Sequence, residues 1–500
     1  MNKKLEQLYK KLALLKKYDH ALGVISFDFE TSVPKKAMEE EGDMMSFFAN
    51  QAFKIKSAKS FKQLICDLYQ EIDSLDYLDQ ILVKNLYEDY LKDKNITPQM
   101  DLEMSKIYNA AYIDWLKAKQ EKNYELFLPS FKKVVAISEK AVNLRDPQVL
   151  LPNMYDNLLN DCEKGMLQED LDVFFKELKE GLLKLIGKIK ASKKTIRSDF
   201  LSRRVPIYKQ EAFSKYLLTL NGFDFDRGCL STTEHPFTSP ISENDARVTT
   251  HYHEDMVLSN IYSIIHEGGH AILMQNEPAE DFKHFINDNA TNGMHESVSR
   301  FFENVIGRSK AYVHLIYPKF IETFDEFSDI SEQELYEAIN IVTPSLIRTE
   351  SDEVTYGLHI VIRYELEKRI CNGELKLEDA SKEWNKLYKE YLGVEVKNDS
   401  EGILQDVHWT SGFGYFPSYA IGNAYNAMYL KELKKVYDFD SLVASGDFKT
   451  INEWLKKHIF SEVNHLTPKE WIKRITGQSL SPKPFLEYLN EKYQEIYDLK

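Results

Sequence analysis

The chain is poor in cysteine, which excludes two structural classes. It has 4 cysteines in 500 residues, and none of them forms a Cys-x-x-Cys pair. A small disulfide-stapled fold needs closely spaced cysteines in even sets, and a cysteine-ligated zinc site needs such pairs. The sequence therefore predicts neither a disulfide framework nor a zinc site built from Cys66, Cys162, Cys229 or Cys371.

Glycine and proline are also few, at 20 and 15 residues. No Gly-, Ser- or Pro-rich linker and no low-complexity tract marks a domain boundary. The composition is 43% hydrophobic and 12% aromatic, which is enough for a large buried core. We expect one continuous domain over residues 1–500, with an N-terminal helical half (1–200), a central core (201–430) and C-terminal helices (431–500).

Long apolar runs and net positive charge are absent as well. No segment approaches the roughly 20 apolar residues of a membrane span, and the first 20 residues form a charged amphipathic pattern rather than a signal-peptide core. The formal net charge of -15 repels phosphate backbones. We therefore expect no membrane partner, no nucleic-acid partner and a cytoplasmic location.

Helical periodicity dominates what is present. Apolar residues recur every three or four positions, the pattern of an amphipathic helix. The segments with this pattern are 3–19, 60–93, 101–145, 167–192, 333–342, 355–370 and 376–391. The sequence therefore predicts an all-α, mainly helical fold.

Residues 233–253 depart from the helical pattern. Two short extended runs flank the turn signal Ser242-Glu243-Asn244-Asp245, and the second run alternates from Arg247 to Tyr252. Such alternation around a turn predicts a β-hairpin. A hairpin with no functional role remains an alternative, but this one directly precedes the strongest motif of the chain.

That motif is His266-Glu267-Gly268-Gly269-His270, within a run whose apolar positions predict a helix ending before Pro278. Spacing of four residues places the two imidazoles on one helix face, close enough to share one zinc ion. Glu267 projects beside them and can accept a proton from water at the metal. The alternative is a pair of core histidines that flank a glutamate by chance.

A third ligand must come from elsewhere in the chain. Leu273 and Asn276 exclude the extended metzincin motif, and Asn289 stands where a metallo-aminopeptidase pattern has Glu. The best candidate is Glu296, on a second predicted helix with Thr291 or Asn292 as N-cap and Gly307 as C-cap. Glu296, Arg300 and Glu303 form a polar stripe on that helix. A solvated salt-bridge stripe is the alternative; three ligands and one open position would suit a catalytic zinc.

Five motifs in order resemble the carboxypeptidase Taq family, thermostable metallocarboxypeptidases with an H-E-x-x-H site. The resemblance runs over most of the chain and is densest between residues 235 and 423. The motifs are His235-Pro236-Phe237, Asp245-Ala246-Arg247-Val248-Thr249, the metal motif followed by His295-Glu296-Ser297, Ile347-Arg348-Thr349-Glu350-Ser351-Asp352, and Gly402-Ile403-Leu404-Gln405-Asp406-Val407-His408-Trp409.

The resemblance implies a fold and an activity. The fold would be a helical body divided by a deep substrate groove, with a small β-hairpin or sheet beside the active site, similar to the neurolysin and angiotensin-converting-enzyme type of gluzincin. The activity would be zinc-dependent release of single amino acids from the free C-terminus of peptides, with one Zn2+ per chain and Co2+ as a substitute. The chain would form a homodimer.

The substrate-binding residues follow from the same motifs. A guanidinium suits a terminal carboxylate, and Arg348 is the first candidate and Arg247, in the motif of Asp245, the second. His408, Tyr415 and Tyr419 are candidates to stabilise the oxyanion, with no order between the two tyrosines. The His235 turn could close one end of the groove. Structural ion pairs and packing remain alternatives for these arginines and tyrosines.

Two rival functions remain. A thimet-type endo-oligopeptidase shares a comparable spacing from the second histidine to the distal glutamate, but the motifs from Arg348 onward favour a carboxypeptidase. A non-catalytic peptide-binding relative is the other rival, and the presence of Glu267 with all three ligands argues against it.

Overall fold

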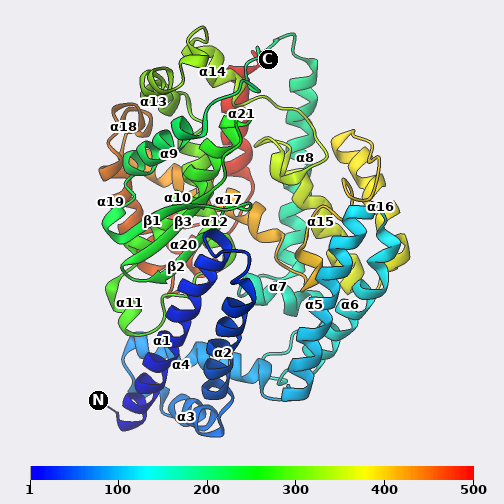
Figure 1. The fold of residues 1–500 in the computed structure, drawn as a ribbon, viewed down its shortest axis with the longest axis vertical. Coiled ribbons are helices and arrows are strands. Elements are labelled where there is room, and N and C mark those ends of the chain that lie inside the picture. The colour runs from blue at the N-terminus through cyan, green and yellow to red at the C-terminus, as the bar shows by residue number, and fades with distance from the viewer. Residues whose placement is uncertain (1, 500) are drawn as a thin grey trace.

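The computed structural model describes residues 2–499 and is mainly helical (Figure 1). The first four helices form an N-terminal lobe with a small core of its own, separate from the main core. Ile286 joins this small core from the middle of the chain. The helices of the lobe are α1 (Lys3–Thr31), α2 (Met38–Ser57), α3 (Lys59–Gln70) and α4 (Tyr77–Asp93), with the short turn η1 (Ile72–Ser74) before α4.

The helices that follow begin the main core. Their apolar faces pack together because each repeats apolar residues at helical spacing, as Leu171, Phe174, Leu178 and Leu182 do on α8. The elements are α5 (Pro98–Glu121), η2 (Tyr124–Leu126), α6 (Leu128–Asn143), α7 (Met154–Cys162) and α8 (Gln168–Ala191).

The middle of the chain contains the sheet and two helices that carry the metal-site candidates. The elements are α9 (Ile207–Asn221), η3 (Phe225–Arg227), β1 (Gly228–Thr232), β2 (Thr238–Ser242), β3 (Asp245–Thr250), α10 (Val257–Asn276), α11 (Ala279–Lys283), α12 (Asn292–Arg300) and the π-helical turn η4 (Phe301–Ile306). Helix α10 packs against β2, β3 and α12, so the sheet and α12 both border the residues of α10.

The last part of the chain contains α17, which is buried over most of its length and packs against α12, α15, α20 and α21. Its elements are α13 (Lys310–Thr323), η5 (Asp325–Phe327), α14 (Glu332–Ala338), η6 (Arg348–Glu350), α15 (Tyr356–Cys371), η7 (Leu377–Asp379), α16 (Ala380–Leu387), η8 (Tyr388–Leu392), η9 (His408–Thr410), α17 (Pro417–Val436), α18 (Phe439–Ser445), α19 (Phe448–His458), η10 (Phe460–Glu462), α20 (Pro468–Thr476) and α21 (Lys483–Ile496).

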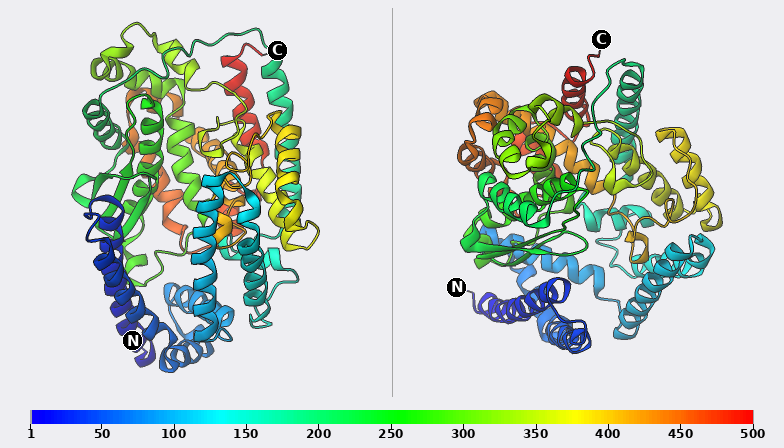
Figure 2. Two further views of the ribbon diagram at one scale, coloured as in Figure 1. Left: turned by 45° about the vertical axis from the view of Figure 1, so that its right-hand side comes forward. Right: turned by 45° about the horizontal axis from the view of Figure 1, so that its top comes forward.

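The sheet has the order β1-β3-β2, with β1 parallel and β2 antiparallel to β3. Thr238 of β2 pairs with Val248 of β3, and the register shifts between Pro240 and Ser242. Strand β2 also packs against α1 from the N-terminal lobe, and Phe27 of α1 meets Phe237 edge-on with ring centroids 5.9 Å apart. Both views in Figure 2 show the green sheet beside the blue α1.

Most of the predicted architecture is confirmed. Each predicted helical segment contains helix, but 60–93 and 101–145 are each divided into two α-helices, and the helix predicted over 333–342 ends at Ala338. The predicted hairpin is β2 and β3 around the turn at 243–244. The third strand, β1, was not predicted, because a parallel partner leaves no local turn signal. Within residues 2–499, none of the helices combines the length and the apolar character needed to cross a bilayer. The single domain and its division into residues 1–200, 201–430 and 431–500 remain predictions.

Candidate metal centre

Helix α10 places His266 and His270 side by side. Residues four apart lie one above the other on a helix, and the two ring centroids are 5.1 Å apart. The opposite face of α10 carries Ile261, Ile264 and Ile265, which are buried in the main core. Burial of that apolar face therefore fixes the direction in which both imidazoles point.

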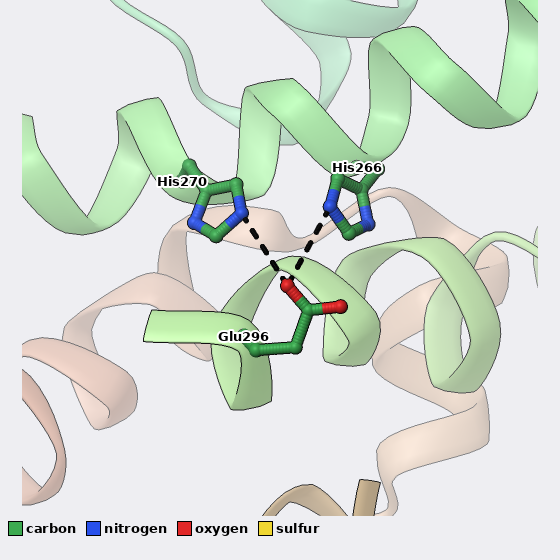
Figure 3. A group of neighbouring side chains, drawn as sticks. All are labelled: His266, His270 and Glu296. Carbon is green, nitrogen blue, oxygen red and sulfur yellow. Dashed lines mark ion pairs between the residues drawn. The ribbon is translucent and has the colours of Figure 1, made fainter. Parts of the chain in front are cut away.

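Glu296 of α12 completes the group (Figure 3). Its Oε2 lies 3.8 Å from Nε2 of His266 and 3.7 Å from Nε2 of His270, and the three ligand atoms lie within 4.8 Å of one another. Ligand atoms around a tetrahedral zinc ion with bonds of about 2.1 Å are about 3.4 Å apart. The three side chains therefore fit one metal ion, with Oε2 of Glu296 facing both histidines.

Two glycines allow α12 to approach α10 on one side and α17 on the other. A Cβ atom on Gly269 of α10 would lie 2.8 Å from Cα of Ser299, and a Cβ on Gly422 of α17 would lie 3.0 Å from Cβ of Glu296. Any larger residue at either position would push against the backbone or the ligand residue of α12. The second glycine of the metal motif therefore serves close helix packing, as does Gly422 on the other side.

Arg300 and Glu303 hold the ligands in orientation. Arg300 donates from Nε to Oε1 of Glu296 at 2.7 Å, which leaves Oε2 facing the histidines. Glu303 lies in η4 and its Oε2 is 2.9 Å from Nδ1 of His266. A proton on Nδ1, donated to this carboxylate, leaves the Nε2 lone pair for a metal, as in other carboxylate–histidine–metal groups.

The protonation states of the metal-binding side chains and of Glu303 follow from their burial and from the neighbouring charged groups. Burial and the neighbouring His266 lower the pKa of His270 well below its usual value, which favours the neutral, metal-binding imidazole. Burial opposes the charged form of His266, but Glu296 and Glu303 outweigh it and raise the pKa of this histidine. Despite burial, Arg300 and His266 lower the pKa of Glu303 to about 2, so Glu303 stays ionised.

Strand β2 positions Glu267. The hydroxyl of Thr238 donates to Oε2 of Glu267 at 2.7 Å, and it also lies 2.9 Å from the backbone carbonyl of that residue. Burial raises the pKa of Glu267, and the neighbouring His266 and the Thr238 hydrogen bond partly offset this rise. A carboxyl group with a raised pKa takes up a proton more readily, which suits a residue that accepts and then returns one. Thr238 was not predicted, although it directly follows His235-Pro236-Phe237.

A cavity of about 810 Å³ lies beside the metal group, and the residues that line it include both His266 and Arg348. Arg348 is only 7% exposed and its guanidinium is held by Asp406, with Nε and Nη2 at 3.0 and 2.9 Å from Oδ1. Nη1 donates to the hydroxyl of Tyr356 at 3.1 Å. A guanidinium has five N–H groups, so three are engaged and two remain for a ligand in the cavity.

Asp245, Arg247 and His235 surround a different part of the sheet. Arg247 pairs with Asp245, which precedes it by two residues, with Nη2 and Oδ2 2.7 Å apart. Its guanidinium also stacks 5.2 Å from the ring centre of Phe27. The structure thus gives Arg247 a local ion pair and does not place it on the wall shared by His266 and Arg348. His235 is exposed in the loop before β2.

His408, Tyr415 and Tyr419 lie together. Tyr415 and Tyr419 have ring centroids 5.4 Å apart, and the hydroxyl of Tyr419 is 3.4 Å from Nε2 of His408. Burial raises the pKa of Tyr415 to about 12, with Glu296 contributing, so the hydroxyl keeps its proton near the metal group. Burial lowers the pKa of His408 to about 4, and its imidazole is therefore neutral at pH 7.

Glu367 of α15 holds the loop that carries His408 and Tyr415. It accepts hydrogen bonds from Nε1 of Trp409 at 2.9 Å, from the backbone N–H of Gly414 at 3.1 Å and from the hydroxyl of Tyr155 at 3.2 Å. Gly414 has φ of +90° and lies against the backbone of α7, where a Cβ would be 2.7 Å from a carbonyl oxygen. Only glycine suits this position. No local sequence pattern pointed to Glu367.

Comparison with known proteins gives one consistent result. Residues 7–493 match the model of the family described as carboxypeptidase Taq (M32) metallopeptidase. Carboxypeptidase 1 of Bacillus subtilis (strain 168) is 35% identical over 495 residues, covering 98% of this chain and 98% of that protein. Thermostable carboxypeptidase 1 of Thermus thermophilus is 33% identical and covers 96% of each. The solved structure of an M32 carboxypeptidase from Deinococcus radiodurans R1 has a TM-score of 0.95 at 29% identity and covers 100% of both chains.

Proposed function

Because this chain belongs to the carboxypeptidase Taq (M32) metallopeptidase family and is thus a metallocarboxypeptidase, we propose a catalytic or binding role for each of its site residues. His266, His270 and Glu296 hold the divalent ion, Glu267 transfers the proton, and Arg348 binds the terminal carboxylate of a peptide. The observation that carries the proposal is the convergence of three ligand atoms within 4.8 Å beside a cavity that also contains Arg348.

The ion that best suits this site is zinc. Two imidazoles and one carboxylate are a common ligand set of catalytic zinc, whereas Mg2+ and Ca2+ prefer sites made of oxygen atoms. Cobalt accepts the same nitrogen and oxygen ligands and is the expected substitute. When bound, zinc supplies Lewis acidity, which polarises a carbonyl and lowers the pKa of bound water to about 7.

Glu267 acts as general base and then as general acid. Thr238 holds Oε2 of Glu267, so Oε1 is the oxygen that takes the proton of the attacking water. The same carboxyl group then gives this proton to the amine of the departing residue. Burial of Glu267, which is 8% exposed, limits competing proton exchange with bulk water.

Arg348 restricts cleavage to the C-terminal end of a peptide substrate. Its two unengaged N–H groups can bind both oxygens of a terminal carboxylate, a charge-assisted pair that a peptide amide cannot replace. Asp406 and Tyr356 fix the guanidinium, so it cannot swing aside to let a longer chain pass. Recognition by a fixed arginine therefore excludes cleavage within a chain.

The tyrosines have separate roles in this proposal. Tyr415 is 37% exposed and keeps its proton, so it donates to the oxyanion. Tyr419 lies under Arg348, whose guanidinium is 4.9 Å from its ring centre, and it forms the wall behind the terminal carboxylate. His408, neutral and adjacent to both, donates or accepts according to its tautomer.

A time course on one peptide in two forms tests the proposal. The peptide with a free C-terminus should shorten one residue at a time in a mass spectrum, and its C-terminal amide should remain intact. Internal fragments from both forms would instead indicate an endopeptidase. Glu267→Gln should keep zinc and lose turnover; turnover at the normal rate would exclude Glu267 as the proton carrier.

We also propose that the chain works in the cytoplasm as a homodimer, as resemblance to the family implies. The four cysteines are all free thiols in the structure, which fits a reducing compartment. Light scattering after gel filtration tests the assembly, and a single species at the mass of one chain would contradict it.

A further inference from the structure

Glu163 is a buried carboxyl group that the proposed chemistry does not use. It directly follows α7 and has no exposed surface. Among the described residues, no lysine, arginine or histidine forms an ion pair with it within 4.0 Å. A buried acid without a cationic partner costs stability, and such departures from local rules are expected where a function requires them.

The carboxylate of Glu163 is bound to the first residues of α12. Its Oε1 accepts a hydrogen bond from the backbone N–H of Gly293, and its Oε2 accepts one from the hydroxyl of Thr291 at 2.8 Å. Thr291 is the N-cap residue of α12, but its side chain makes no capping hydrogen bond within the helix. Glu163, 128 residues earlier in the chain, therefore supplies the cap.

The space around this contact is closed. A Cβ atom on Gly293 would lie 2.9 Å from Oε1 of Glu163, so the glycine allows the carboxylate to reach the helix backbone. The negative charge also lies at the positive end of the helix dipole. Burial raises the pKa of Glu163 to about 7, and the nearby Ser418 hydroxyl and the hydrogen bonds from Thr291 and Gly293 partly offset this effect.

Glu296 follows Gly293 by three residues, less than one helical turn. Gly269 of α10 and Gly422 of α17 let these two helices pack against α12 from two sides. The two hydrogen bonds to Glu163 restrain α12 along its axis at its N-terminus, about one turn before the metal ligand. We infer that Glu163 is a positioning residue, which fixes the axial position of α12 and so places Glu296 for metal binding.

This inference rests on the proposed metal site, and its readout is metal affinity rather than activity. Glu163→Met removes both acceptors at similar volume and should weaken zinc binding at least tenfold in competition with a chelating dye. Glu163→Gln keeps an acceptor for Gly293 and a polar group for Thr291, and it should remain within about threefold of wild type. Outer ligand-sphere partners typically contribute 10–100-fold to metal affinity.

Glu367→Met is the matched control. Glu367 is equally buried, its pKa is likewise raised to about 7 by burial, and it also binds a backbone N–H, but it holds the loop at 408–416 rather than a metal ligand. Its loss should leave zinc affinity within about twofold of wild type. Equal loss of affinity in the two methionine variants, or none in Glu163→Met, would overturn the inference.

A second pair of variants covers the case in which Glu163→Met does not fold. Thr291→Val removes the hydroxyl that donates to Glu163, and Thr291→Ser retains it. Zinc affinity should fall in the valine variant and recover in the serine variant, and equal affinities would count against Glu163. A wild-type protein that binds no zinc would refute the metal site itself, and this inference with it.

Discussion

Substitution of Gly269 by alanine should weaken metal binding by displacing α12. The new Cβ would lie 2.8 Å from Cα of Ser299 and 3.2 Å from the carbonyl oxygen of Val298. Carbon atoms in contact lie about 3.5–4.0 Å apart, so α12 would have to move by about 0.7 Å. Metal–ligand distances tolerate only about 0.2 Å, and Glu296 is carried on the displaced helix.

The expected effect is larger on the metal than on the fold. Alanine gains roughly 1 kcal/mol of helix propensity over glycine, and overpacking costs about 1–3 kcal/mol, so the free energy of unfolding should fall by at most about 2 kcal/mol. Zinc affinity should fall at least tenfold, about 1.4 kcal/mol or more. Competition with a chelating dye measures the affinity, and excess zinc should restore part of kcat/KM.

The neighbouring glycine provides the control. A Cβ on Gly268 would lie 2.7 Å from Cδ2 of Leu218, which is the end of a side chain and can move for about 0.5–1.5 kcal/mol. Gly268→Ala should therefore bind zinc as tightly as wild type. The reasoning is refuted if both variants lose affinity equally, or if Gly269→Ala loses none.

Three further variants test other parts of the site. Thr238→Val should lower kcat about tenfold with zinc content unchanged, because Glu267 loses the hydrogen bond that orients it; an unchanged kcat would contradict this. Arg348→Lys should raise KM at least tenfold in initial-rate measurements, because lysine cannot bind a carboxylate at two points, and an unchanged KM would exclude Arg348. Burial raises the pKa of Glu367 to about 7, so the native state holds this proton more tightly than the unfolded chain and stability should fall as pH rises from about 4.5 to about 7. In urea unfolding, Glu367→Gln should reduce this pH-dependent loss of unfolding free energy by up to about 3 kcal/mol. An unchanged dependence of the unfolding free energy on pH would exclude Glu367 as its source.

Local patterns in the sequence were sufficient for the elements that carry the ligands. The spacing of His266 and His270 required a helix, and α10 provides it, ending at Asn276 before Pro278. The N-cap signal at Thr291 and the polar stripe with Glu296 correspond to α12. The polar stripe continues to Glu303 in the π-helical turn η4, and no residue pattern predicted this π-helical turn.

Contacts between distant segments could not be read from those patterns. Glu163 and Thr238 act on residues 128 and 29 positions away, and nothing in a linear sequence states which buried carboxyl or hydroxyl group will face which helix. The same limit applies to β1, whose partner β3 is reached only after β2. The packing of Gly269 against α12 likewise became evident only in three dimensions.

Anomalous diffraction at the zinc absorption edge, from crystals of the zinc-loaded enzyme, tests the central claim most directly. The account predicts one strong peak per chain within about 2.0–2.2 Å of Nε2 of His266, Nε2 of His270 and a carboxylate oxygen of Glu296. A peak at other residues, or no peak in crystals of fully active enzyme, would contradict it.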